Sequence, residues 1–201
     1  MTVKFLGNIL ETEIPELIPP FELGKVGVFD EVVFLPKDHP NVVAWKVHLY
    51  DSELTDWLGP FLPHVTVCRQ PFNEGEWLTH FRKLPVVFNA FHLYESVGNL
   101  NYISIRSIAF EPPFIPIEHT ADYAYLIRGK SENELYLNAL IALAFEFPSF
   151  APYIQPCKSI KEINQCIARA DIEMGCPFKA VSYHGEVVAG KYLEWEMIVD
   201  V

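Results

Sequence analysis

Short, mostly apolar β-like runs dominate the first half of the chain, a pattern typical of β-strands. Five runs show it: residues 26–35, 42–50, 64–69, 85–95 and 102–108. Between them, residues 51–61 and 72–84 repeat apolar side chains at helical spacing, so each predicts a short helix. The apolar faces of these helices would carry Leu54, Trp57 and Leu58, and Trp77, Leu78 and Phe81. This half is therefore expected to be α+β with a mostly antiparallel sheet.

The second half begins with an alternating run at residues 122–128, which predicts a strand that turns at Gly129. Directly after the turn, Ser131 and Glu134 form a capping box, in which two side chains bind the free N–H groups at a helix start. The run that follows, residues 135–147, is apolar almost all round from Ala139 onward. We therefore expect this helix to be largely buried.

A second capping box, S-I-K-E, predicts an amphipathic helix over residues 159–175. Two further strands are predicted at residues 178–184 and 192–201. In the last run apolar and polar residues alternate cleanly, so one face should join the core and the other should carry polar side chains, including Asp200. This half is also expected to be α+β.

The boundary between the halves is a proline-rich stretch, A-F-E-P-P-F-I-P-I-E-H at residues 109–119. Prolines remove backbone donors and disfavour helix in the residue before them, so regular elements are expected to stop here. The sequence thus predicts two small domains, residues 1–107 and 108–201.

Charge narrows the possible functions. The formal net charge is −11, and both halves are acidic. A protein that binds the phosphate backbone of nucleic acid needs a basic face. General DNA or RNA binding is therefore not expected, and a protein partner is favoured. No apolar run is long enough to span a bilayer, and the first residues lack the layout of a signal peptide. The four cysteines are scattered, which favours reduced thiols and a cytoplasmic location.

Two acidic motifs in the second half suggest a metal site. E-H-T-A-D ends at Asp122, at the mouth of a predicted strand, and V-D-V places Asp200 at the end of another. Carboxylates are typical ligands of hard divalent cations. Taken singly, a carboxylate at a strand end is more often a turn or solvent-exposed residue. The sequence alone leaves both interpretations open.

The two motifs together resemble the archease family, whose opening is similar to E-H-T-A-D and whose closing signature is similar to F-K-A-V-S-Y-H-G-E followed by V-D-V. The resemblance implies a divalent ion, calcium, magnesium, manganese or zinc, bound by Asp122 and Asp200. It also implies a functional role for Lys179 and a tRNA-splicing-type RNA ligase as partner, whose guanylylation archeases promote. Further motif positions are Glu118, His119, His184 and Glu186. One departure is the short stretch of residues 146–177, where the family carries a longer insertion.

A second resemblance lies in the first half. M-T-V-K-F-L-G and P-H-V-T-V-C-R are similar to the two H-x-T motifs of 2H phosphoesterases, the RNA ligase-like 2′,3′-cyclic phosphodiesterases. In that family two histidines act as general acid and general base, and the threonines bind the phosphate. The matching residues are Thr2, His64 and Thr66. The first histidine would precede Met1, so the resemblance predicts a degenerate lobe; His48 and His92 are expected to be packed in the core.

The sequence therefore leaves three alternative functions open. The first is an accessory protein of RNA ligation and tRNA splicing, in which an archease-like metal-binding domain follows a degenerate 2H lobe. The second is an enzyme, a 2H-type RNA 2′,3′-cyclic phosphodiesterase. The third is a two-domain protein without either activity. RNA ends are the substrate or partner common to the first two.

Overall fold

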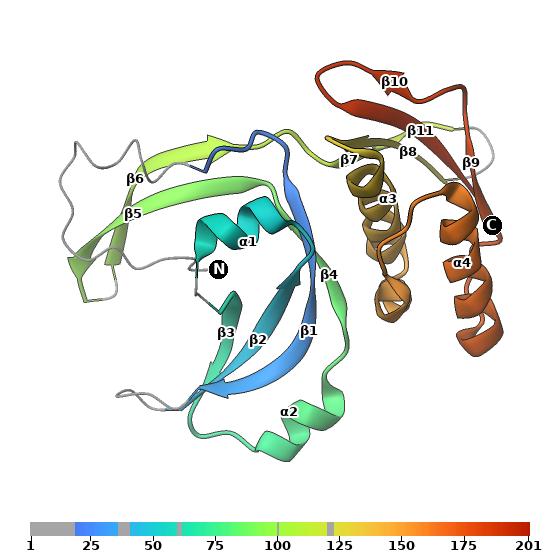
Figure 1. Ribbon diagram of the computed structural model, residues 1–201. Coiled ribbons are helices and arrows are strands. Elements are labelled where there is room, and N and C mark those ends of the chain that lie inside the picture. The colour runs from blue at the N-terminus through green and yellow to red at the C-terminus, as the bar shows by residue number, and fades with distance from the viewer. Residues whose placement is uncertain (1–18, 36–40, 60–61, 100, 120–122) are drawn as a thin grey trace. The chain divides into compact units, whose positions relative to one another are not determined.

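The computed structural model describes residues 19–35, 41–59, 62–99, 101–119 and 123–201 (Figure 1). Contacts between Cα atoms divide the chain into two compact units, Met1–Phe110 and Glu111–Val201. In the described ranges both units combine helices with antiparallel sheets, so the α+β class is confirmed. No helix in these ranges is long and apolar enough to cross a membrane.

The first unit contains a four-stranded sheet in the order β3-β2-β1-β4. Its strands are β1 (Lys25–Leu35), β2 (Val42–Leu49), β3 (His64–Arg69) and β4 (Leu84–Phe88), and each neighbouring pair is antiparallel. These strands form at the predicted β-like runs, which are rich in Val and other residues that favour strands.

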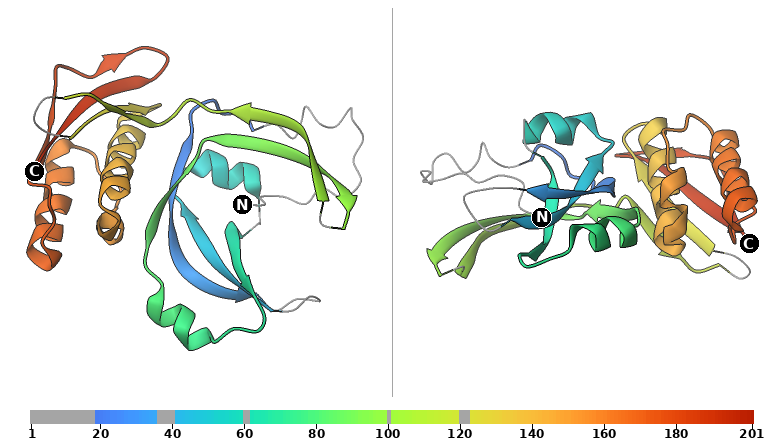
Figure 2. Two further views of the ribbon diagram at one scale, coloured as in Figure 1. Left: turned by 180° about the vertical axis from the view of Figure 1, so that it is seen from behind. Right: turned by 90° about the horizontal axis from the view of Figure 1, so that it is seen from below.

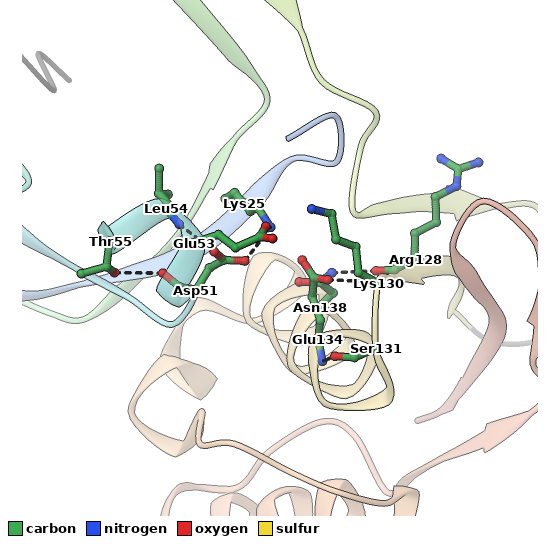
Figure 3. Close-up of polar contacts among 10 residues, drawn as sticks. All are labelled: Lys25, Asp51, Glu53, Leu54, Thr55, Arg128, Lys130, Ser131, Glu134 and Asn138. Atoms are coloured by element: carbon green, nitrogen blue, oxygen red, sulfur yellow. Dashed lines mark hydrogen bonds and ion pairs between the residues drawn. The ribbon is translucent and has the colours of Figure 1, made fainter. Parts of the chain in front are cut away.

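Two short helices accompany this sheet, α1 (Ser52–Leu58) and α2 (Glu74–His80). Asp51 caps α1, since its Oδ1 accepts a hydrogen bond from the Leu54 amide at 2.8 Å. The other oxygen, Oδ2, lies 2.5 Å from Nζ of Lys25, whose side chain is only 1% exposed (Figure 3). One carboxylate thus caps a helix and neutralises a buried ammonium, which would otherwise be costly to bury. The hydrophobic cluster beside this pair contains Phe21, Leu54 and Phe110.

The remaining strands of the first unit form a separate two-stranded hairpin, β5 (Ala90–Gly98) with β6 (Asn101–Ala109) (Figure 2). The sequence predicted one strand over residues 85–95, but the structure divides it after Phe88 between two sheets. The apolar alternation continues across the break, so only the change of partner strand reveals it.

The second unit is built on a sheet whose central strands are β8 (Tyr123–Gly129) and β11 (Leu193–Asp200). Strand β7 (Phe114–Ile117) pairs with β8, whereas β9 (Ala180–Tyr183) and β10 (Val188–Ala189) both pair with β11. All of these pairings are antiparallel.

Strand β7 corrects an expectation, because the proline-rich boundary was predicted to lack regular structure. Pro116 lies within β7 and faces Tyr125 of β8 in the register. Since β7 ends the path of the sheet, the missing N–H of Pro116 can face away from β8 without breaking a ladder.

Helices α3 (Glu132–Glu146) and α4 (Ile160–Met174), joined through the 3₁₀ helix η2 (Pro148–Tyr153), cover one face of this sheet (Figures 1 and 2). As predicted, α3 is buried all round along residues 135–144. Helix α4 buries one stripe, and the left-handed cap residue Gly175 ends it, also as predicted. The buried side chains of this stripe are Ile163, Cys166, Ile167 and Ala170.

The start of α3 is held by the predicted capping residues (Figure 3). Ser131 Oγ accepts from the Glu134 amide at 3.3 Å, and the Glu134 carboxylate accepts from the Lys130 amide at 2.7 Å. One turn later the buried Asn138 donates through Nδ2 to the carbonyl of Arg128 at 2.6 Å. Helix α3 is therefore tied to the end of β8 by hydrogen bonds as well as by apolar packing.

Candidate functional site

One end of the second sheet collects three of the segments that the sequence singled out. Asp200 is opposite Ala180 of β9, and the amide of Lys179 donates to the Asp200 carbonyl at 2.8 Å. On the other side of β11, Val199 pairs with Tyr123, the first residue of β8. Tyr123 follows the E-H-T-A-D motif directly in the sequence. The antiparallel register therefore brings the ends of β8, β9 and β11 together.

Lys179 is exposed, and its ammonium is held at this end of the sheet. Nζ donates to the main-chain carbonyl of Val201 at 2.5 Å. Backbone and side chain of Lys179 thus both bind the terminal segment of β11. Lys179 and Asp200 are therefore neighbours at this end of the sheet.

Asp200 belongs to the polar face of β11, as the alternation predicted. Trp195, Met197 and Val199 are buried beneath the helices, whereas Glu196 and Asp200 are exposed. An exposed carboxylate on the helix-free face is chemically suited to bind a cation. Asp122, the second predicted ligand, lies outside the described residues.

Two histidines of the motifs lie close to each other in the second unit. The rings of His119 and His184 have centroids 6.3 Å apart and are inclined by 74°. The His184 amide donates to the Glu196 carbonyl at 2.9 Å, which fixes its place beside β11. Glu118 and Glu186 are exposed. In the part of the chain that the structure describes, no group of three or more His, Cys, Asp or Glu side chains could hold a metal ion.

Strand β9, which follows Lys179, is fastened by a residue that sequence reasoning missed. Asn164 of α4 accepts from the Val181 amide through Oδ1 at 2.7 Å and donates to the Val181 carbonyl through Nδ2 at 3.1 Å. Its side-chain amide thus binds the two backbone groups of Val181 in the way that a neighbouring strand would. The available signal was a polar residue within the apolar stripe of α4, next to Ile163.

The 2H-like residues of the first unit are only partly described. His64 opens β3, is half-buried, and places Nδ1 2.8 Å from the Leu62 carbonyl oxygen. Thr66, two residues along the same strand, is exposed and pairs with Ala44. Thr2 lies outside the described residues. Whether these side chains share one groove with Thr2 stays a prediction.

The expectation that His48 and His92 are core residues is wrong, because both side chains are exposed. His48 packs edge-on against Tyr50, with centroids 4.6 Å apart, and His92 Nδ1 lies 2.8 Å from Ser107 Oγ. Each lies in an apolar run, yet every second side chain of a strand faces away from the core. Strand alternation, and not the mean apolarity of the run, determined their exposure.

All four cysteines are free thiols. The fold brings two of them together, with Cys157 Sγ and Cys166 Sγ 3.9 Å apart. Burial, and secondarily the neighbouring Cys166 thiol, raises the pKa of Cys157 to about 12. Cys157 is therefore held as a neutral, packed thiol.

A comparison with known proteins gives no match to a family model, to a curated protein or to a solved structure. The functional interpretation therefore depends on the residues and their arrangement.

Proposed function

We propose that this is a cytoplasmic accessory protein of RNA ligation, in which an archease-like, metal-binding second unit activates a tRNA-splicing-type RNA ligase. One observation carries the proposal: Lys179, Asp200 and the start of β8 meet at one end of the sheet, although they come from three separated segments. The first unit serves as a degenerate 2H-like lobe that contributes contacts with the partner or its RNA ends.

The metal of this proposal is a divalent ion bound by Asp200 together with Asp122. Carboxylate oxygens suit calcium, magnesium or manganese, and an imidazole ligand from His119 or His184 would also admit zinc. The register places His184 opposite Glu196, four residues along β11 from Asp200. Of this pair the structure describes Asp200, whose exposed carboxylate at the end of β11 fits such an ion in type. The bound ion would supply a fixed positive charge at this end of the sheet.

Lys179 has a separate role in the proposal. Its ammonium cannot ligate a cation, and it binds the Val201 carbonyl within the same strand-end cluster. A held positive charge beside a carboxylate is suited to meet an acidic or phosphorylated group of a partner. We therefore assign Lys179 to activation of the ligase and not to metal binding.

The experiment that tests activation measures guanylylation of a tRNA-splicing-type RNA ligase with and without the protein. We expect faster guanylylation and multiple turnover, with Lys179→Ala losing the stimulation while folding normally. Equal ligase rates with and without the protein, over a range of divalent ions, would refute the proposal.

A melting experiment tests the metal site independently of any partner. A bound ion stabilises the native state by RT ln(1 + [L]/Kd), about 2.7 kcal/mol at a hundredfold excess over Kd. We expect a divalent ion to raise the melting temperature of the wild type, and Asp122→Ala or Asp200→Ala to abolish the rise. Glu196→Ala, which removes an exposed carboxylate from the same face of β11, is the matched control and should keep it.

The same preparations can test the enzyme alternative. Hydrolysis of a 2′,3′-cyclic nucleotide that disappears in His64→Ala would favour a working 2H phosphodiesterase over a degenerate lobe. We expect no such hydrolysis, because removing one of two acid–base groups costs about 10²–10⁴-fold in rate.

A further inference from the structure

The first unit contains an aromatic pocket that neither family resemblance uses. It lies between strand β2 and helix α2 and has a volume of about 290 Å³. Its lining consists of Trp45, Glu76, Trp77, His80 and Phe81. Three of these five side chains are large aromatic hydrocarbons or indoles, one is a carboxylate and one is an imidazole.

The local sequence accounts for the arrangement. Two pairs of lining residues are each four positions apart, Glu76 with His80 and Trp77 with Phe81. Both pairs therefore lie on one side of α2 and its C-cap. Trp45 comes from β2, and its ring meets that of Phe81 at a steep angle of 65°, with centroids 6.0 Å apart. The two rings therefore form walls that stand at an angle to each other, as in a cage.

The apolar face predicted for α2 is only partly correct, because one of its three residues is exposed beside this pocket. Leu78, which was grouped with Trp77 and Phe81, is 60% exposed. None of the residues of α2 is buried. The helix therefore does not bury an aliphatic stripe against the sheet. Its residues Glu76, Trp77 and His80, with the C-cap residue Phe81, line the pocket instead.

The charge of the lining selects the class of ligand. Aromatic faces carry the negative part of the ring quadrupole and attract cations. Glu76 adds a formal negative charge, and the whole chain has a net charge of −11. A phosphate or carboxylate ligand would be repelled, and a neutral apolar ligand would gain nothing from Glu76. A primary ammonium is strongly hydrated and would lose favourable water contacts against three aromatic rings. A methylated ammonium is weakly hydrated and loses few such contacts.

From this lining we propose that the pocket binds a quaternary ammonium group, with its methyl groups against Trp45, Trp77 and Phe81 and its charge near Glu76. A volume of about 290 Å³ lies at the lower end of the range for ligand pockets, so it suits a small head group and not a nucleotide. The head group can belong to a free small cation such as choline or to a trimethylated lysine of a peptide.

The test is a calorimetric and tryptophan-fluorescence titration of the intact protein. Choline is compared with 3,3-dimethylbutan-1-ol, which has the same shape but carries a carbon in place of the charged nitrogen. We expect choline to bind about two- to thirtyfold more tightly than its neutral isostere, which is the contribution of cation–π contacts to affinity. A trimethyllysine peptide and its unmodified form make a second arm, which distinguishes a free cation from a peptide.

Two variants on α2 connect binding to the pocket. Glu76→Gln removes the charge and should weaken choline about tenfold, whereas Glu74→Gln, on the same helix but outside the lining, should leave it unchanged. Trp77→Leu keeps an apolar side chain, removes the π face and should also weaken binding. Circular dichroism identifies any variant that has lost its fold.

Several outcomes would overturn the inference. Equal binding of choline and its isostere would show an apolar pocket without cation selectivity. Equal weakening by Glu76→Gln and Glu74→Gln would show attraction by the overall acidic charge. Saturable binding of adenosine without binding of choline or trimethyllysine would assign the pocket to a stacked base, and no binding of any of them would leave it a packing gap.

Discussion

The hydrogen bonds of Asn164 predict how strongly helix α4 holds the strand that follows Lys179. Within the described residues β9 pairs with β11 alone, and the outward backbone groups of Val181 bind Asn164. Val181 is 3% exposed, so water cannot readily replace the amide of Asn164. Asn164→Ala should therefore leave a buried N–H and a buried carbonyl without partners.

The expected cost follows from these two bonds. Leaving a buried group without its hydrogen bond costs about 1–3 kcal/mol, so the two groups together lose about 2–6 kcal/mol. Alanine is a better helix former than asparagine, which offsets about 0.5 kcal/mol of this loss. We therefore expect Asn164→Ala to lower the free energy of unfolding by about 1.5–5.5 kcal/mol.

The measurement must report on the second unit by itself. Trp195 is the single tryptophan of residues 111–201, so the ¹⁹F signal of 5-fluorotryptophan at this position follows the unfolding of that unit in urea. Amide hydrogen exchange at Val181 gives a local reading at the bond itself. The matched control is Gln165→Ala, at the next position of α4, where the side chain is exposed.

A difference of less than about 0.5 kcal/mol between Asn164→Ala and Gln165→Ala would refute the reasoning, because surface substitutions usually fall within that range. Unchanged protection of the Val181 amide in Asn164→Ala would refute it independently. If both observations hold as expected, the position of Lys179 depends on a clamp from α4 as well as on its bond to Val201.

Three further predictions concern other parts of the fold. Gly129→Ala should lower the melting temperature and reduce the free energy of unfolding by about 2–3 kcal/mol, because its Cβ would lie 2.5 Å from a backbone nitrogen of α3. The control is Gly190→Ala, where the nearest atom is 3.8 Å away and alanine should be tolerated. Cys157, with its pKa raised to about 12 by burial, should resist alkylation at pH 8 while half-buried Cys68 reacts. The unfolded Cys157 thiol ionises above about pH 8.5, whereas the folded one stays neutral. The free energy of unfolding should therefore fall as the pH rises above this value, as urea unfolding at pH 7 and 10 would show. Ser131→Ala should cost about 1 kcal/mol in the same assay, through loss of the helix cap.

Local patterns determined much of the second unit. The capping residues of α3 and α4, the apolar run of α3 and the alternation of β11 each depend on residues within one turn or one strand. Such features are set by backbone hydrogen bonding and side-chain periodicity, which a short window of sequence contains. The exposure of Asp200 on the polar face of β11 followed from the same periodicity.

Tertiary structure decided which strands pair and which side chains meet. The break between β4 and β5, the strand through Pro116 and the outward-facing His48 all depend on partner strands from other parts of the chain. So do the contacts of Lys179 with the end of β11 and the clamp by Asn164. The contacts of Asn164 and Lys179 join residues 17 and 22 positions apart, and they depend on the register of the strand pairing, which no local pattern encodes.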